Sequence, residues 1–490
     1  MPSKVSIKKN YIMNVILTLS TFIFPFITFP YVSRVLGPEG TGRVGFATDL
    51  IAYFSMLAHL GIPTYGIRAC AKVRDNKIEL TRVTHELLII NLIMSAIAYL
   101  LLAVALVTVP DLQDDKLLYV IVSMTIMLSS IGMEWLYKAL EQYTYITIRS
   151  VIFKLVALAS MFLLVRSESD YVIYGAITIF ASSASNVLNL INAHKYIGFR
   201  FVGNYNLRRH LKPVAVFFAM ACATIIYTHL DGLMLGFMVS KTEVGYYKAA
   251  VKIKTILVSV VTSLGTVLLP RASYYVEHGD LAEFRRITRK ALNFVCLLAA
   301  PLSVFFMLFA REGVLLLSGD KYLESIVPMR VIMPTLLLIG ITNILGIQIL
   351  VPTGREKVVL YSEIAGALID VIINALLIPR MKSTGAAIGT LVAEFVVLVV
   401  QYCALRKEIN QAFKQISYWK IIAGIILGTG LSISVMQVLG LGIFFSILIS
   451  AILFFGIYGI FLLLTKEKLT VELYNQVVGK INKRKKRRSV

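Results

Sequence analysis

Charged residues are scarce in this chain. Of its 490 residues only 16% are charged, whereas 58% are apolar, and the mean hydropathy is +0.78. This composition excludes an ordinary soluble domain, whose surface needs more polar residues. Acidic residues are rarer than basic ones, and 27 Asp and Glu against 49 Lys and Arg leave a net charge of +22. In so apolar a chain this excess favours the topological charge bias of a membrane protein over nucleic-acid binding, so we expect no nucleic-acid partner.

Residue patterns for metals, disulfides and catalysis are also missing. Cys70, Cys222, Cys296 and Cys403 show neither metal-ligand spacing nor an extracellular pairing pattern, so we expect no metal site. The joints between apolar runs are short, which leaves no room for a soluble catalytic domain. They carry no paired-carboxylate or His-rich constellation. We therefore expect a protein that is not an enzyme and needs no cofactor.

Long apolar runs are what the chain has instead. A helix crossing a hydrocarbon core of about 30 Å needs about 20 largely apolar residues. Fourteen runs meet this requirement: 11–35, 44–63, 83–109, 116–137, 147–165, 171–192, 213–238, 249–270, 289–309, 328–351, 357–378, 384–405, 418–439 and 442–464. Strands in lipid would need a closed barrel with alternating residues, which these unbroken runs do not show. The fold class is therefore an all-α integral membrane protein with about 14 transmembrane helices.

The basic residues orient these helices. Most of the 49 Lys and Arg residues fall in every second joint, beginning with the N-terminus and ending with the basic tail at 480–488. Basic loops are retained in the cytoplasm, so this alternation predicts that both termini are cytoplasmic. The tail has two interpretations: a solvated retention signal, which we favour, or a contact with anionic lipid.

Short motifs repeat about 200 residues apart. Leu36-Gly37, Gly42 and Leu60-Gly61 recur in the same order as Leu235-Gly236, Gly245 and Leu264-Gly265. A repeat of six helices keeps its orientation, which predicts two pseudo-symmetric six-helix lobes around a central cavity. The predicted parts are an N-terminal lobe at 1–200, a C-terminal lobe at 201–410, two further helices at 411–465 and a basic cytoplasmic tail at 466–490.

Polar residues at helical spacing should line that cavity. The eighth run carries Lys248, Lys252, Thr255, Ser259, Thr262 and Thr266 in steps of three or four. Similar stripes of Ser, Thr and Asn occur in the first, sixth and seventh runs. Hydroxyls in membrane helices also pack helices together or bond to their own backbone, and for the sixth and seventh runs both interpretations stay open. Two lysines on one face favour a cavity for the eighth run.

Several segments together resemble the bacterial polysaccharide flippases. These Wzx-type exporters of O-antigen, capsule and teichoic-acid precursors belong to the superfamily that also holds multidrug antiporters and the lipid II flippase. The similar segments lie in the family's order between residues 10 and 405. They are residues 30–42 (PYVSRVLGPEGTG), 60–68 (LGIPTYGIR), 134–137 (EWLY), 231–236 (DGLMLG), 244–247 (VGYY) and 269–272 (LPRA).

The resemblance implies a transporter that flips a polyprenyl-pyrophosphate-linked oligosaccharide from the cytoplasmic to the outer leaflet. An anionic pyrophosphate cannot cross hydrocarbon unpaired, so a cationic path is needed. The resemblance also implies alternating access, the bacterial cytoplasmic (inner) membrane, and polysaccharide polymerase or glycosyltransferases as candidate partners. The basic candidates for headgroup binding are Arg34, Arg43, Arg68, Lys248, Lys252 and Arg271. The four arginines sit at the ends of predicted helices. Their positions are explained equally well by side chains that snorkel to the membrane surface or by charges that fix the topology.

Carboxylates within the runs are costly and are therefore usually paired or functional. Asp49, Asp231, Asp370 and Glu394 are the candidates. One interpretation is coupling to a Na⁺ or H⁺ gradient, and the other is a structural partner for a basic residue. These positions by themselves identify neither a proton relay nor a sodium cage.

Two other functions compete with the flippase. A cation-coupled multidrug exporter of the same superfamily should have a more apolar and acidic cavity, which Lys248 and Lys252 disfavour. A membrane-embedded glycan polymerase or ligase commonly carries a large external loop with catalytic residues, and the short outer joints disfavour it.

Overall fold

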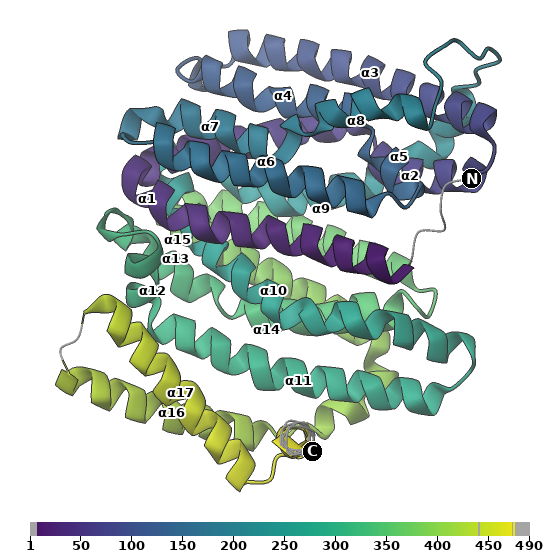
Figure 1. Ribbon diagram of the computed structural model, residues 1–490. Coiled ribbons are helices and arrows are strands. Elements are labelled where there is room, and N and C mark those ends of the chain that lie inside the picture. Colours follow the sequence, from purple (N-terminus) through teal and green to yellow (C-terminus); the bar gives the residue numbers. More distant parts are fainter. Residues whose placement is uncertain (1–6, 440–441, 473, 476–490) are drawn as a thin grey trace, which may run out of the picture. The chain divides into compact units, whose positions relative to one another are not determined.

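The computed structural model describes the backbone of residues 7–439, 442–472 and 474–475, with the side chains of all these residues except 7, 8, 11, 22, 264–271, 281 and 436–439. Within these ranges every regular element is helical, which confirms the all-α fold class (Figure 1). The chain divides into two compact units, Met1–Lys248 and Ala249–Val490.

The first unit is built from nine α-helices and four short 3-10 or π turns within the described residues. They are α1 (Ile7–His59), α2 (Ile62–Val73), α3 (Lys77–Thr108), η1 (Pro110–Leu112), α4 (Lys116–Gly132), α5 (Glu134–Ala139), α6 (Tyr143–Leu164), η2 (Glu168–Asp170), α7 (Tyr171–Ile179), η3 (Phe180–Ala184), α8 (Asn186–Asn192), η4 (Ala193–Lys195) and α9 (Arg208–Met238). The first turns of α10 (Lys241–Glu277) also belong to this unit.

The second unit contains the rest of α10, seven further α-helices and two short 3-10 or π elements among the described residues. They are α11 (Leu281–Leu308), α12 (Ala310–Leu317), η5 (Asp320–Ser325), α13 (Ile326–Ile332), α14 (Thr335–Asn343), η6 (Ile344–Leu350), α15 (Glu356–Lys414), α16 (Tyr418–Leu439) and α17 (Ile443–Leu464). Helices α16 and α17 lie side by side (Figure 1).

Many of the helices are long and apolar enough to cross a membrane. Among the described residues nine meet this test by length and composition, or ten if the bent pair Asp320–Ile332 and Thr335–Leu350 is one span. Two of them, at 12–73 and 356–414, have 62 and 59 residues, far more than the ~20 of a single crossing. Each covers two of the predicted runs, and the count of fourteen crossings stays a prediction.

Backbone breaks divide these two long helices where the sequence predicts a joint. Gly37 in α1 has φ 65° and ψ −177°, a conformation that suits glycine because it has no Cβ, and Pro38 follows it. In α15 the break is at Lys382, with φ 52° and ψ −131°. Both breaks lie between predicted runs, at 36–43 and 379–383, so neither joint needs a long loop.

Large apolar side chains cover the outside of the helices. Leu100, Val107, Leu163 and Leu164 expose between 55% and 71% of their surface, and many other Ile, Leu and Phe residues are similar. A water-soluble protein does not expose apolar residues along whole helices, whereas lipid solvates them well. This surface supports a multi-pass membrane protein.

Glycines let the start of α10 approach the break in α1. A Cβ on Gly42 would overlap the backbone of Lys241, and one on Gly245 would overlap the carbonyl of Pro38. Gly42 and Gly245 are positions that the sequence pairs in its repeat. The boundary between the compact units, at residue 248, differs from the repeat boundary near residue 200, and the two six-helix lobes stay a prediction.

Candidate functional site

Three charged or titratable side chains of the first unit meet between its helices. We call this group, which consists of Asp49, His229 and Lys248, the Asp49 cluster. Asp49 of α1 is only 1% exposed. Lys248 Nζ lies 2.6 Å from its Oδ2, and His229 Nδ1 of α9 lies 2.7 Å from its Oδ1. The side chains of Lys248 and His229 remain 28% and 25% exposed. A buried carboxylate needs such partners, because leaving it unpaired would cost about 3–5 kcal/mol.

Small residues let the three helices come close enough for these contacts. A Cβ on Gly232, one turn along α9 from His229, would overlap the carboxylate of Asp49. A Cβ on Gly45 would touch Cγ of Lys248 at 3.4 Å. Gly232 belongs to the DGLMLG segment of the family resemblance, so at least one glycine of that segment has a packing reason.

Asp231 is held beside this cluster. It is 6% exposed and accepts a hydrogen bond from the hydroxyl of Tyr247, which precedes Lys248 on α10. Two of the four candidate carboxylates, Asp49 and Asp231, therefore receive donors from consecutive residues of the same helix. These contacts join the C-terminal part of α9 and the N-terminal part of α10 to each other and to the second half of α1.

Arg43 is engaged in a second ion-pair cluster of the first unit. Its Nη1 lies 2.7 Å from Asp115 Oδ1 and its Nη2 lies 2.8 Å from Glu39 Oε1. Its guanidinium carbon stands 5.2 Å from the ring centre of Tyr171, whose hydroxyl donates to Asp115 at 3.0 Å. Arg43 also lines a cavity of about 300 Å³ with Lys241 and Asp111. Its charge is largely matched by these two carboxylates, and its assignment to headgroup binding stays a prediction.

Arg34 and Arg68 are exposed at the surface of the first unit. Arg34 Nη1 donates to the carbonyl of Pro30 at 2.6 Å, within its own helix. Arg68 lies on α2, six residues after its first residue Ile62. The structure does not bring either arginine to the Asp49 cluster.

The remaining candidates belong to the second unit. Asp370 and Glu394 are 2% and 5% exposed, on the two halves of α15 before and after its break. A Cβ on Gly389 would meet the oxygen atoms of Asp370 and Asn374, so the halves pack closely at these polar groups. Lys252 is half-buried on α10. The side chain of Arg271 lies outside the described residues.

The hydroxyls of the predicted polar stripes bond to their own helices. In α10, Thr255 and Thr262 donate to carbonyls four residues earlier, and Ser259 to one three residues earlier. Thr224 and Thr228 of α9 do the same. Such bonds satisfy the donor but leave lone pairs on the oxygen, so they remove the cost of burial and still allow contact with a polar ligand.

Sequence reasoning misses two residues with dense polar contacts. His229 is overlooked because a lone histidine carries little signal. Arg149 of α6 is 4% exposed, and its guanidinium donates to Ser185 Oγ at 2.7 Å, Asn186 Oδ1 at 3.1 Å and Glu134 Oε2 at 3.2 Å. An arginine inside a predicted run, together with Glu134 of the EWLY segment, is the signal that could have found it.

These observations define a multi-pass, all-helical membrane protein with paired charges buried among its helices. A model of the family described as "Polysaccharide biosynthesis protein" matches residues 7–276, which is more than half of the chain. The chain belongs to this family, the polysaccharide flippase family of the multidrug/oligosaccharidyl-lipid/polysaccharide exporter superfamily. A second model, MatE, matches residues 216–376.

Similar proteins include two described as putative O-antigen transporters. The one from Escherichia coli (strain K12) is 25% identical over 408 residues, which cover 83% of this chain and 98% of the relative. The one from Shigella dysenteriae is 26% identical over 410 residues, which cover 81% and 100%. Both names are those of transporters, as expected for a chain that is not an enzyme.

Solved structures of two transporters share the fold. The lipid II flippase MurJ in its inward closed conformation superposes with a TM-score of 0.70 at 14% identity, covering 95% of this chain and all of that one. An inward-facing MATE multidrug transporter superposes with a TM-score of 0.59 at 14% identity, covering 81% and 96%. The family model confirms the predicted family, these superpositions support the all-helical fold, and the site residues stay predictions.

Proposed function

We propose that this protein is a flippase that moves a polyprenyl-pyrophosphate-linked oligosaccharide from the cytoplasmic to the outer leaflet by alternating access, for surface polysaccharide biosynthesis. It acts in the bacterial cytoplasmic (inner) membrane with both termini in the cytoplasm. Membrane lipid surrounds it, and polysaccharide polymerase or glycosyltransferases are its candidate protein partners. The observation that carries the proposal is the similarity to O-antigen transporters over 98% and 100% of their lengths.

Basic side chains within the helices fit this substrate. Its pyrophosphate and sugar hydroxyls need polar partners while they cross the membrane, whereas the polyprenyl tail stays in lipid. Lys248 is held among helices by a carboxylate and keeps part of its surface accessible. We propose that Lys248 and Lys252, with Arg34, Arg43, Arg68 and Arg271 as further candidates, bind the headgroup.

The Asp49 cluster offers a way to couple transport to an ion gradient. A proton or Na⁺ taken up by Asp49 would weaken its hold on Lys248, and the freed ammonium group would then bind a phosphate oxygen. Asp231 accepts a hydrogen bond from the residue before Lys248, so it is the second coupling candidate. Asp370 and Glu394 are candidates in the second unit because both are buried carboxylates.

Charge reversal at Lys252 tests the substrate path. In cells that lack their own flippase, the parent protein should restore the surface glycan, and Lys252→Glu should abolish export while the protein stays inserted and abundant. Lys254→Glu makes the same charge change two residues away, off the polar stripe, and should export normally. Unaltered export by Lys252→Glu would remove this residue from the path. Failure of the parent to restore any surface glycan would contradict the function itself.

Coupling is tested by flipping in vesicles that contain the purified protein. The rate should depend on an imposed H⁺ or Na⁺ gradient, and Asp231→Asn should lose that dependence. A parent protein that flips at the same rate without any gradient would rule out coupling through these carboxylates. The flippase proposal would survive this outcome, because downhill flipping needs only the cationic path.

A multidrug exporter is the second candidate function, and the MatE match at residues 216–376 supports it. A drug cation would be repelled by Lys248 and Lys252 unless their charges were matched. Efflux of organic cations by the parent protein, enhanced in Lys252→Glu, would favour the exporter over the flippase.

A further inference from the structure

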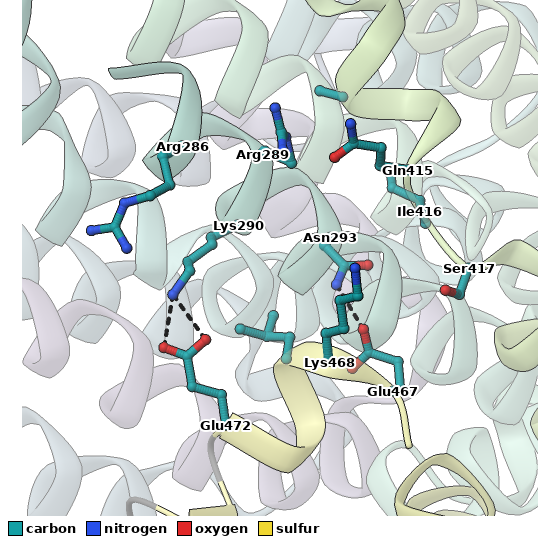
Figure 2. A pocket seen from close by; sticks show the side chains of 12 residues that line it. Arg286, Arg289, Lys290, Asn293, Gln415, Ile416, Ser417, Glu467, Lys468 and Glu472 are labelled. Carbon is teal, nitrogen blue, oxygen red and sulfur yellow. Dashed lines mark hydrogen bonds and ion pairs between the residues drawn. The ribbon is translucent and has the colours of Figure 1, made fainter. Parts of the chain in front are cut away.

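A cavity of about 390 Å³ lies wholly within the second unit and has basic walls (Figure 2). Its walls come from residues 286–293 of α11, residues 412–417 at and just after the end of α15, and residues 467–472, which follow α17. The predicted charge alternation puts all three segments on the cytoplasmic side. Four basic and two acidic residues line the cavity: Arg286, Arg289, Lys290, Lys468, Glu467 and Glu472.

Both carboxylates of the cavity already have partners. Lys290 Nζ lies 2.7 Å from Glu472 Oε1. Glu467 accepts from Asn293 Nδ2 at 2.9 Å and from the backbone N–H and hydroxyl of Thr470 at 2.7 and 2.8 Å. Dashed lines in Figure 2 mark the bonds from Lys290 to Glu472 and from Asn293 to Glu467, and none is drawn to Arg289. Glu472 is paired with Lys290, and Arg286 is paired with Glu283, which does not line the cavity. This leaves the positive charges of Arg289 and Lys468 against the single negative charge of Glu467.

Arg289 lines this cavity, and one of its donors lacks a protein acceptor within the described part of the chain. Its Nε is buried and has no hydrogen-bond partner among the described residues. A second cavity, of about 330 Å³, shares Arg289 and is also lined by Arg285 and Lys407. The carboxylate there, Glu408, is bound at both oxygens by Arg355 at 2.8 Å. Arg289 thus lines two cavities whose carboxylates already have other partners.

Because the Arg289 Nε is buried, an anion in the cavity would bind the Nη donors at the end of the guanidinium. Phosphate suits the planar fork of arginine, because two of its oxygens can accept parallel bonds while further oxygens accept from Lys468 across the cavity. The volume is within the range of about 300–1,000 Å³ typical of ligand pockets. Basic pockets on the cytoplasmic side of membrane proteins lie level with the anionic headgroups of lipids.

We propose that this cavity binds a phosphate-bearing anion through Arg289 and Lys468. Two sources carry that chemistry at the cytoplasmic face: the headgroup of an anionic lipid and a free phosphate compound. The site goes beyond the proposed flippase function and does not depend on it, because it involves none of the residues assigned to the substrate path.

Binding to the full-length protein in neutral detergent tests the site. Short-chain phosphatidylglycerol and inorganic phosphate are titrated separately and followed by calorimetry, with short-chain phosphatidylcholine as the zwitterionic control. Arg289→Gln and Lys468→Gln should each weaken binding of the anionic probe at least tenfold. Lys414→Gln removes the same charge from an exposed position near the end of α15 that lines neither cavity, and it should leave binding unchanged.

The probes distinguish the two sources. Saturable binding of phosphatidylglycerol alone identifies a lipid headgroup as the ligand, and binding of inorganic phosphate identifies a free phosphate compound. If neither probe binds saturably, or if both variants bind as tightly as the parent, the proposal is wrong. Lys468 is exposed, so Lys468→Gln decides the question even where Arg289→Gln lowers the yield of folded protein. No outcome depends on flipping activity.

Discussion

The charged side chains of the two units are arranged differently. In the first unit, the buried Asp49 carboxylate contacts both Lys248 and His229, so its negative charge is matched by neighbouring side chains. In the second, Arg289 faces two cavities, while Glu467, Glu472 and Glu408 are bound by other residues. A paired, buried charge must be displaced before it can bind anything, whereas an open basic cavity is ready to bind. The paired charges of the first unit suit a group that changes its partners during transport, whereas the basic cavity of the second unit suits a permanent binding site.

Removal of the Asp49 carboxylate should have the largest effect on the stability of the protein. Asp49→Ala leaves Lys248 and His229 without their acceptor, and breaking a buried pair costs about 3–5 kcal/mol, reduced here because both basic side chains are partly exposed. We expect a clear fall in the thermal midpoint in detergent, measured by size-exclusion chromatography after heating.

The double variant Asp49→Leu/Lys248→Met is the matched control for this loss. An ion pair replaced by apolar residues of similar volume is often neutral for stability, so the double variant should recover much of the midpoint. If Asp49→Ala is as stable as the parent, Asp49 does not hold the cluster together.

Gly232→Ala should have an intermediate effect, because it disturbs the same cluster through packing. The added Cβ would overlap the Asp49 carboxylate, and overpacking typically costs about 1–3 kcal/mol. Gly430→Ala is the control on α16, where a Cβ would meet no atom within 4 Å. We expect a lower thermal midpoint for Gly232→Ala and an unchanged or slightly higher one for Gly430→Ala. Equal midpoints would mean that α9 can shift without cost.

Substitution of Glu467 should have the smallest effect on the thermal midpoint, and this effect should depend on pH. Burial favours its neutral form, but hydrogen bonds from the Thr470 backbone and the Asn293 side chain outweigh this, so the pKa of Glu467 lies below its ordinary value. Its contribution to stability is full above the pKa of the unfolded chain and is lost as the pH falls through the folded pKa. The midpoint difference between parent and Glu467→Gln should therefore shrink from pH 7 towards pH 4. A constant difference would show that Glu467 acts through packing.

The sequence predicts some of these residues and misses others for identifiable reasons. Asp49 and Lys248 are found because charges inside apolar runs are costly and thus conspicuous. His229 is missed because histidine is tolerated in many settings. Arg289 does not stand out in the sequence, where it is one of many basic residues between apolar runs. Its lack of an acceptor depends on where Glu408, Glu467 and Glu472 find partners.

Sequence alone determined the class of this protein, because hydrocarbon admits only helices whose backbone groups are satisfied internally, and ~20 apolar residues in a row leave no other solution. It also determined the family, through short segments in a shared order. Tertiary structure decided which charges meet. Asp49 contacts Lys248, which lies 199 residues further along the chain. This contact is possible because Gly45 on α1 and Gly232 on α9 let the helices approach closely. Such contacts depend on the close packing of distant residues, which local patterns of hydropathy and charge do not encode.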